Sequence, residues 1–188
     1  MATVLVTGAN RGIGLEYCRQ LSVRGDHVIA VCRKASRELG SLGVQIEAGI
    51  ELTEASALDE LMSRLQSQCL DGVILNAGIL HSNALNNLDV EAIRQQFEIN
   101  ALAPLRLVSA LTSNLSSGSW IALMTSRMGS IADNSSGGSY GYRMSKAALN
   151  IAGKSLAIDL KPQGIAVVIL HPGLVATRMI NYNPSGIS

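Results

Sequence analysis

The chain has 188 residues, of which 47% are hydrophobic and 15% charged, and its formal net charge is +1. This composition is typical of one well-buried domain, and the few, scattered basic residues exclude a nucleic-acid surface or an anionic-membrane patch. The three cysteines and three histidines are dispersed, which predicts neither a disulfide framework nor a metal site.

Strand-like and helix-like segments alternate along the whole chain. Apolar runs predict strands near residues 3–7, 27–32, 44–48, 71–75, 119–125 and 165–170. Helices are predicted near residues 13–24, 54–68, 88–113 and 140–160. This alternation predicts an α/β fold of the Rossmann type, a doubly wound parallel sheet with helices on both faces and a ligand crevice at the carboxyl ends of its strands. Because neither a signal segment nor a membrane span is recognisable, we expect a single cytoplasmic domain over residues 1–188.

A glycine-rich turn follows the first predicted strand and opens the first predicted helix. It reads Thr7-Gly8-Ala9-Asn10-Arg11-Gly12-Ile13-Gly14. Glycines let the backbone turn tightly and approach a ligand, and the helix N-terminus offers N–H groups to a phosphate. The turn therefore predicts a dinucleotide site with contacts from Gly8, Asn10, Arg11, Gly12, Ile13 and Gly14.

The second predicted strand ends at Arg33 and Lys34, where a dinucleotide fold meets the adenosine ribose, and no acidic residue occupies positions 30–37. An acidic side chain there would repel a 2′-phosphate, whereas a guanidinium can hold it through paired N–H donors. With Arg11 as a second cation, Arg33 predicts NADP(H) as the cofactor. The alternative is that Arg33 is a solvated surface charge after a strand.

Tyr142 and Lys146 are four residues apart and share one face of the predicted helix 140–160. The phenol of a free tyrosine has a pKa of about 10, too high for acid-base catalysis near neutrality. Because a nearby cation favours the ionised form, we expect Lys146 to lower the pKa of Tyr142. Tyr140 is followed four positions later by Met144 and cannot play the same part.

The turn and the segment Tyr142-Arg143-Met144-Ser145-Lys146 together resemble the short-chain dehydrogenase/reductase family, in particular its NADP-preferring, carbonyl-reductase-like members. The resemblance runs from Thr3 to about Thr177. It implies hydride transfer between NADP(H) and a small carbonyl or alcohol substrate, with Tyr142 as the general acid/base and Lys146 on the nicotinamide ribose. It also implies that Ser126 polarises the carbonyl and that Asn100 helps hold a water linking the lysine to solvent. The separation of Ser126 from Tyr142 is slightly longer than the family's usual one, which leaves three alternatives, Ser130, Ser135 and Ser139.

Three further segments match elements of the family. Asn76, Ala77 and Gly78 end the fourth predicted strand and are expected beside the adenosine ribose. Glu51 and Leu52 stand where the family contacts adenine, with a glutamate in place of the usual aspartate. The last segment follows the sixth strand and implies cofactor contacts from Pro172, Gly173, Val175 and Thr177, with the Val175 backbone and the Thr177 hydroxyl on the nicotinamide carboxamide.

Only eleven residues follow Thr177, whereas members of the family continue further. We therefore expect that the chain lacks its natural C-terminal, substrate-covering segment, and the substrate cannot be read from it. The apolar stretches Ala101–Leu115 and Ala147–Leu160 predict a homodimer or higher oligomer. Two alternatives to an enzyme are a non-catalytic NADP-binding sensor and a structural partner of the same fold.

Overall fold

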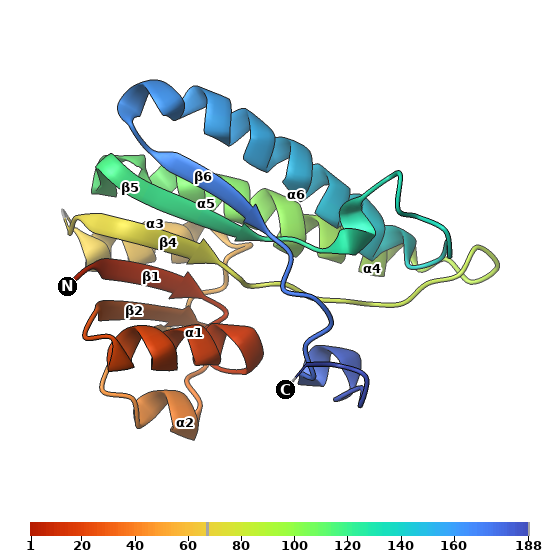
Figure 1. Ribbon diagram of the computed structural model, residues 1–188, viewed down its shortest axis with the longest axis horizontal. Helices are drawn as coiled ribbons and strands as arrows, with labels where there is room; N and C mark the ends of the chain where they lie inside the picture. Colours follow the sequence, from red (N-terminus) through yellow and green to blue (C-terminus); the bar gives the residue numbers. More distant parts are fainter. Residues whose placement is uncertain (67, 188) are drawn as a thin grey trace.

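The computed structural model describes residues 1–66 and 68–187. Its strands are β1 (Thr3–Thr7), β2 (His27–Cys32), β3 (Gln45–Ala48), β4 (Leu70–Leu75), β5 (Leu115–Met124) and β6 (Ala166–Leu170). They form one parallel sheet in the order β3-β2-β1-β4-β5-β6 (Figure 1). From β1 the chain continues through β2 to β3 at one edge of the sheet. It then crosses back to β4, beside β1, and continues through β5 to β6 at the other edge. The predicted doubly wound α/β fold is confirmed, and its switch point lies between β1 and β4.

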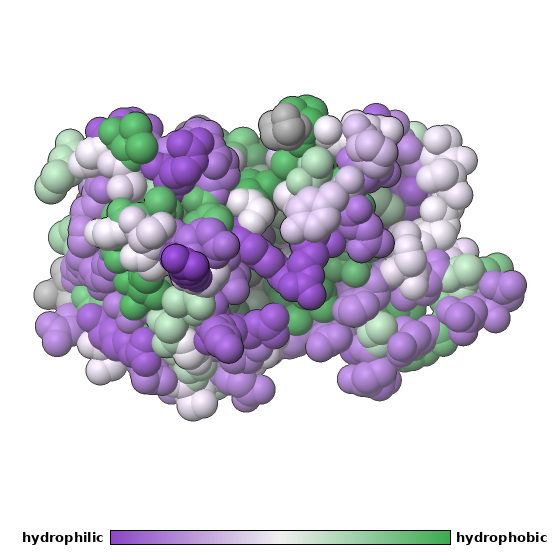
Figure 2. Space-filling view, turned by 90° about the horizontal axis from the view of Figure 1, so that it is seen from below, coloured by the Kyte–Doolittle hydropathy of each residue, from purple (hydrophilic) through white to green (hydrophobic). Residues whose placement is uncertain are grey.

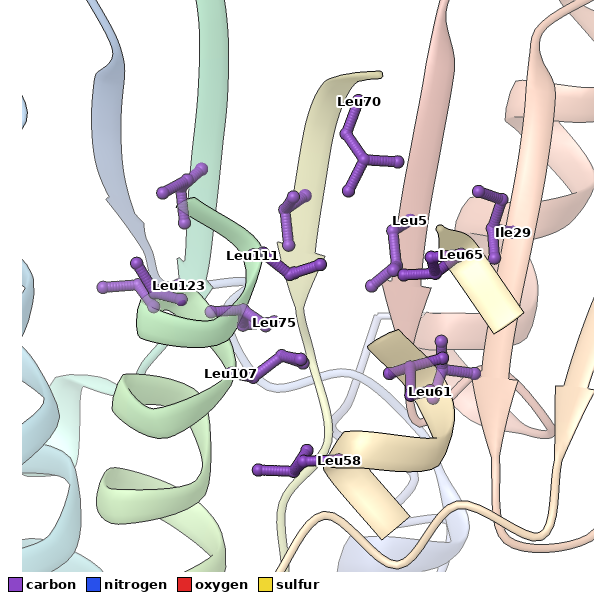
Figure 3. Close-up of a cluster of buried hydrophobic side chains, with 14 of the residues drawn as sticks. Leu5, Ile29, Leu58, Leu61, Leu65, Leu70, Leu75, Leu107, Leu111 and Leu123 are labelled. Carbon is purple, nitrogen blue, oxygen red and sulfur yellow. The ribbon is translucent and has the colours of Figure 1, made fainter. Parts of the chain in front are cut away.

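Helices cover both faces of the sheet because successive strand residues point to opposite sides. On one face, α1 (Gly12–Val23) and α2 (Arg37–Gly40) pack with Val4, Val6 and their neighbours. On the other, α3 (Ala55–Leu65), α5 (Ala103–Leu111) and α6 (Tyr140–Asp159) pack around Leu5, Leu75 and Leu123. Figure 3 shows the leucines of α3 and α5 lying over the central strands. Burial of these apolar side chains on both faces holds the sheet rigid and positions its carboxyl edge.

The helix predicted over residues 88–113 is confirmed as one uninterrupted helical stretch, residues 90–114, but it is not a regular α-helix throughout. The structure has α4 (Val90–Phe97), a π-helical segment η1 (Glu98–Leu102), α5 and a final 3₁₀ turn (Thr112–Asn114). Pro104 has no N–H to donate to the carbonyl of Asn100. The N–H of the preceding residue, Ala103, bonds to the Glu98 carbonyl, five residues back rather than the four of an α-helix. The wide turn buries Asn100 completely.

Other boundaries differ less. The strand predicted from residue 119 begins at Leu115, because Leu115 already pairs with Leu70; the polar run of residues 116–119 then bulges out, and regular pairing resumes at Trp120 opposite Gly72. Gly72 allows this pairing, since a Cβ there would lie 2.2 Å from the Trp120 ring. The helix predicted over residues 54–68 ends at Leu65, and residue 67 lies outside the described residues. The single-turn helix α2 was not predicted.

The surface of the described residues mixes polar and apolar groups. On the face seen in Figure 2, hydrophobic side chains lie between hydrophilic ones and do not form one continuous hydrophobic patch. No helix within residues 1–66 and 68–187 is both long and apolar enough to cross a membrane. Along the edge strand β6, Val168, Ile169 and Leu170 remain partly exposed, so this edge of the sheet is open.

Candidate active site

A crevice opens at the carboxyl ends of β1, β4, β5 and β6, beside the switch point, and encloses a cavity of about 150 Å³. Ten of the predicted site residues line it: Ile13, Asn76, Gly78, Ser126, Tyr142, Lys146, Pro172, Gly173, Val175 and Thr177. The other predicted residues lie outside its lining: Gly8, Asn10, Arg11, Gly12, Gly14, Arg33, Glu51, Leu52, Ala77 and Asn100. The fold therefore gathers elements from the whole length of the chain at one edge of the sheet.

The glycine-rich turn has backbone angles or close neighbours at its three glycines that disfavour a side chain. Gly8 and Gly12 have φ angles of +65° and +53°, in the left-handed region that favours glycine. A Cβ on Gly14 would lie 2.3 Å from the Gly8 carbonyl oxygen, and a Cβ on Gly8 would lie 2.9 Å from the Ala77 Cα. The turn and the start of α1 thus present bare backbone toward the crevice, a cradle that suits a pyrophosphate group.

Hydrogen bonds lock the ends of β1 and β4 together. The Thr7 hydroxyl oxygen accepts the backbone N–H groups of Asn76 and Ala77 at 3.0 and 3.1 Å. In return the Asn76 amide donates to the carbonyl oxygens of Thr7 at 3.1 Å and Gly8 at 3.4 Å. This reciprocal bonding sets the distance between the glycine-rich turn and the segment that carries Gly78.

Tyr142, Lys146 and Ser126 meet in the crevice. The first two come from neighbouring turns of α6 and are only 8% and 4% exposed. The Lys146 ammonium lies 5.7 Å from the centre of the Tyr142 ring and donates to the Met124 carbonyl at 2.8 Å. Thr125 and Ser126 follow the end of β5 and both line the crevice. The Ser126 hydroxyl oxygen accepts the Met128 N–H at 3.1 Å. The alternatives Ser130, Ser135 and Ser139 are not among the lining residues.

The electrostatics of the pair differ from the expectation. Burial raises the pKa of Tyr142 above its usual value, and the hydrogen bond with the Ser126 side chain opposes this rise. Burial also lowers the pKa of Lys146 to about 8. The expected lowering of the tyrosine pKa is therefore wrong for this structure, because burial outweighs the other contributions; the Lys146 ammonium itself donates to the Met124 carbonyl. At neutral pH the phenol holds its proton and is in the form that acts as an acid.

Asn100 joins the segment after β4 to α6. Its amide donates to the Ile79 carbonyl at 2.9 Å and to the Ser145 hydroxyl at 3.0 Å, and its oxygen accepts the Ile79 N–H at 2.8 Å. A Cβ on Gly78 would lie 3.1 Å from the Asn100 oxygen and 3.7 Å from the Lys146 nitrogen. Asn100 thus lies one layer behind the crevice, next to the lysine, with its side chain fully hydrogen-bonded.

Arg33 lies at the end of β2 opposite Glu51. The two side chains are 67% and 36% exposed and their nearest charged atoms are 3.4 Å apart. Asn10 connects the glycine-rich turn to this strand end, since its amide donates to the Lys34 carbonyl at 2.9 Å. Leu52, by contrast, packs against the hydrophobic core. An exposed ion pair of this kind is weak, so Arg33 is free to exchange its partner for another anion.

Sequence reasoning missed a group of mainly apolar residues in the crevice: Leu80, Met124, Thr125, Met128, His171, Leu174, Met179 and Ile180. Most follow the ends of β4, β5 and β6 and are brought together by loops. Periodicity carries no signal for such positions. Their only sequence signal was adjacency to Gly78, Ser126 and Thr177.

Comparisons with known proteins agree with this arrangement. A sequence model of the family described as short chain dehydrogenase matches residues 2–186. The chain is 42% identical over 181 residues to the 1-hydroxy-2-glutathionyl-2-methyl-3-butene dehydrogenase of Rhodococcus sp., spanning 95% of this chain and 80% of that protein.

Two solved structures are also similar. A protein from Burkholderia multivorans, described as a short-chain dehydrogenase/reductase with bound NADP, superposes with a TM-score of 0.90 at 29% identity, covering 99% of this chain and 84% of that one. The NADPH-bound carbonyl reductase from chicken fatty liver gives a TM-score of 0.83 at 32% identity, covering 95% and 82%. The expectation of a further C-terminal segment stays a prediction.

Proposed function

The chain belongs to the short-chain dehydrogenase family, and from that premise we propose that it is an NADP(H)-dependent oxidoreductase of the carbonyl-reductase type. The observation that carries the proposal is the meeting of Tyr142, Lys146 and Ser126 in the same crevice as Ile13 and Thr177. The chicken neighbour, named as a carbonyl reductase with NADPH, supports the cofactor and the substrate class.

We propose that the cofactor lies across the carboxyl edge of the sheet. When bound, its nicotinamide supplies or accepts the hydride. The bare backbone at Gly8 and Gly12 receives the pyrophosphate, Asn76 and Gly78 border the adenosine ribose, and the Val175 backbone with the Thr177 hydroxyl anchors the carboxamide. The glycines support this placement because their lack of a Cβ lets the turn pack directly against Ala77 and Thr177, at the segments proposed to border the cofactor.

Three side chains take part in the proposed proton transfer to the substrate. Tyr142, protonated at neutral pH, donates its proton to the substrate oxygen as negative charge develops there. The Ser126 hydroxyl donates a hydrogen bond to the same oxygen and orients the carbonyl. Lys146 holds the nicotinamide ribose and provides positive charge beside the phenolate that forms. Asn100 keeps the segment beside Lys146 in place through its bonds to Ile79 and Ser145, and the water that would connect the lysine to solvent lies beside this residue without a bond to its amide protons.

The function is tested by following NADPH absorbance with small aldehydes, ketones, diketones and quinones, using protein of verified length. Because the Rhodococcus relative is named as a dehydrogenase, NADP with the corresponding alcohols is the second arm. Turnover in either direction supports the proposal. Binding of NADPH without turnover identifies a sensor, and the absence of both identifies a structural partner.

We predict that Arg33→Asp shifts cofactor selectivity toward NAD(H) by about tenfold or more, because a charge-assisted bond to the 2′-phosphate is replaced by repulsion. Glu51→Gln is the matched variant, since it removes the carboxylate that lies 3.4 Å from Arg33. We expect it to shift selectivity the other way, toward NADP(H). The ratio of kcat/KM for the two cofactors is the measurement, and an unchanged ratio in Arg33→Asp would remove this residue from the proposed role.

We also propose that the protein forms a homodimer or higher oligomer through the outer faces of α5 and α6. Apolar side chains stay exposed there, among them Leu105 at 39%, Met144 at 53% and Ile151 at 65%. We expect light scattering at micromolar concentration to give at least twice the mass of one chain. Ile151→Glu should lower the mass to that of a monomer, whereas Val23→Glu, at a more exposed site on α1 (80%), should not. A monomeric wild type would contradict the proposal.

A cytoplasmic location is part of the same proposal. Cys18 and Cys32 are buried, and burial raises the pKa of Cys18 to about 12. Free, buried thiols of this kind are in keeping with a reducing compartment, where cysteines persist without disulfides.

A further inference from the structure

The chain between β4 and α4 is held at alternate residues by buried carboxamides. Ile79 bonds to Asn100, as described above, and the His81 N–H donates to the Gln96 oxygen at 2.9 Å. Gln96 is itself fully buried and donates to the Ala92 carbonyl at 3.2 Å. Two residues further along, Asn83 connects this segment to the start of α6 rather than to α4. The loops that follow β4 and β5 accordingly lie together at the carboxyl end of the sheet (Figure 1).

Asn83 binds the start of α6 twice. Its side-chain oxygen accepts the Gly141 N–H at 3.2 Å, and its carbonyl oxygen accepts the Ser139 N–H at 2.8 Å. The side chain is 9% exposed, and its Nδ2 is the sole buried side-chain nitrogen or oxygen without a hydrogen-bond partner within residues 1–66 and 68–187. A flipped amide would lose the Gly141 bond, so the acceptor position is defined by the structure.

The helix needs this outside acceptor because it lacks one of its own. Ser139, the residue that precedes α6, makes no side-chain capping bond and has a left-handed φ of +48°, following Gly137 and Gly138 at +63° each. Arg143 holds this unusual turn by donating to the carbonyls of Gly137 and Gly138 at 3.3 and 3.2 Å. Asn83 thus occupies the place that an N-cap side chain takes in an ordinary helix.

The first turn of α6 also packs against α4 without spare room. A Cβ on Gly141 would lie 2.4 Å from the Gln96 amide nitrogen and 3.0 Å from the Ile93 Cα. The N–H group that Asn83 binds therefore belongs to Gly141, which its close neighbours on α4 already hold in place. Tyr142 is the next residue along the chain, so the direction of its ring depends on this turn.

We propose that Asn83 is a positioning residue, which caps α6 from outside the helix and so directs the Tyr142 phenol into the crevice. This assignment rests on the proposed function for its kinetic consequence, but the anchoring of α6 is a separate structural statement. The bond it supplies goes to the residue directly before the proton donor, where a small displacement of the turn is carried to the reacting atom.

The test compares three variants. Asn83→Leu removes the acceptor at similar size, and we expect kcat to fall about tenfold or more while the NADPH Kd changes less than about twofold. Asn83→Asp keeps an acceptor and adds a charge that a helix N-terminus favours, and it should restore kcat to within about threefold. Asn114→Leu is the matched control, because it deletes another buried asparagine, which donates at 2.9 Å to the carbonyls of Gln66 and Gln68 far from the crevice.

Hydrogen exchange separates this proposal from the proposed function. In Asn83→Leu the amides of residues 139–145 should exchange about tenfold faster than in wild type, whereas Asn114→Leu should leave them unchanged. If the wild type reduced no carbonyl, the proposed function would fail and exchange at these amides would still decide the assignment. Unchanged exchange in Asn83→Leu would overturn it. So would equal losses of kcat in Asn83→Leu and Asn114→Leu, because the effect would then be one of general stability.

Discussion

Tyr142→Phe is expected to lower kcat at least about a hundredfold, the scale typical of losing a general acid, while the NADPH Kd changes little. The substitution keeps the ring, which is 8% exposed and packed in the crevice. It removes only the hydroxyl that, in our proposal, carries the proton to the substrate oxygen. Steady-state kinetics at saturating cofactor, together with a fluorescence titration of NADPH, measure the two quantities separately.

Tyr140→Phe is the matched control for this result. Tyr140 begins the same helix but does not line the crevice, so its loss should leave kcat within about twofold of wild type. If Tyr142→Phe kept most of its carbonyl-reducing activity, another group would have to act as the acid and the proposed mechanism would fail at its centre.

Lys146→Met is expected to damage both turnover and cofactor affinity, in contrast to Tyr142→Phe. The ammonium is the group proposed to hold the nicotinamide ribose and to stabilise the phenolate, so we expect losses of about tenfold or more in NADPH affinity and about a hundredfold in kcat. Paired titrations of the two variants test this contrast. Equal NADPH affinities in Lys146→Met and Tyr142→Phe would show that Lys146 does not hold the nicotinamide ribose.

The same substitution should stabilise the cofactor-free protein. Lys146 is 4% exposed, and burial lowers its pKa from 10.5 to about 8. At pH 7 the folded chain therefore bears the cost of a buried charge, offset only in part by the bond to the Met124 carbonyl. We expect Lys146→Met to raise the free energy of unfolding by on the order of 2 kcal/mol at that pH.

The gain in stability expected for Lys146→Met depends on pH. Between about pH 8 and pH 10.5 the unfolded lysine still holds a proton that the folded lysine has lost. Unfolding then takes up a proton, so the stability of the wild type rises with pH across this window. The advantage of Lys146→Met should be full below pH 8 and shrink toward pH 10.5. Urea unfolding at pH 7 and pH 10 measures it, and a constant difference would show that the lysine titrates normally in the folded state.

The alternating pattern of the sequence was sufficient to predict the order and type of the main elements. Runs such as Val4-Leu5-Val6 are long enough and apolar enough to be strands buried on both faces. The glycine-rich turn and the spacing of Tyr142 from Lys146 are equally local, because each depends on the geometry of a single turn or helix. These features led to the family and to ten residues that line the crevice.

Only the tertiary structure decided what depends on contacts between distant segments. Neither the π-helical turn before Pro104 nor the start of β5 at Leu115 follows from periodicity, because both depend on which carbonyls and strands lie opposite. The pKa of Tyr142 is set by burial and by Ser126, and the Lys146 ammonium turns to Met124 rather than to the phenol. Asn83 carries no sequence signal, since its role arises from a bond across 58 residues of chain. Local pattern determines elements, whereas burial, charge environment and capping from outside a helix exist only once the chain has folded.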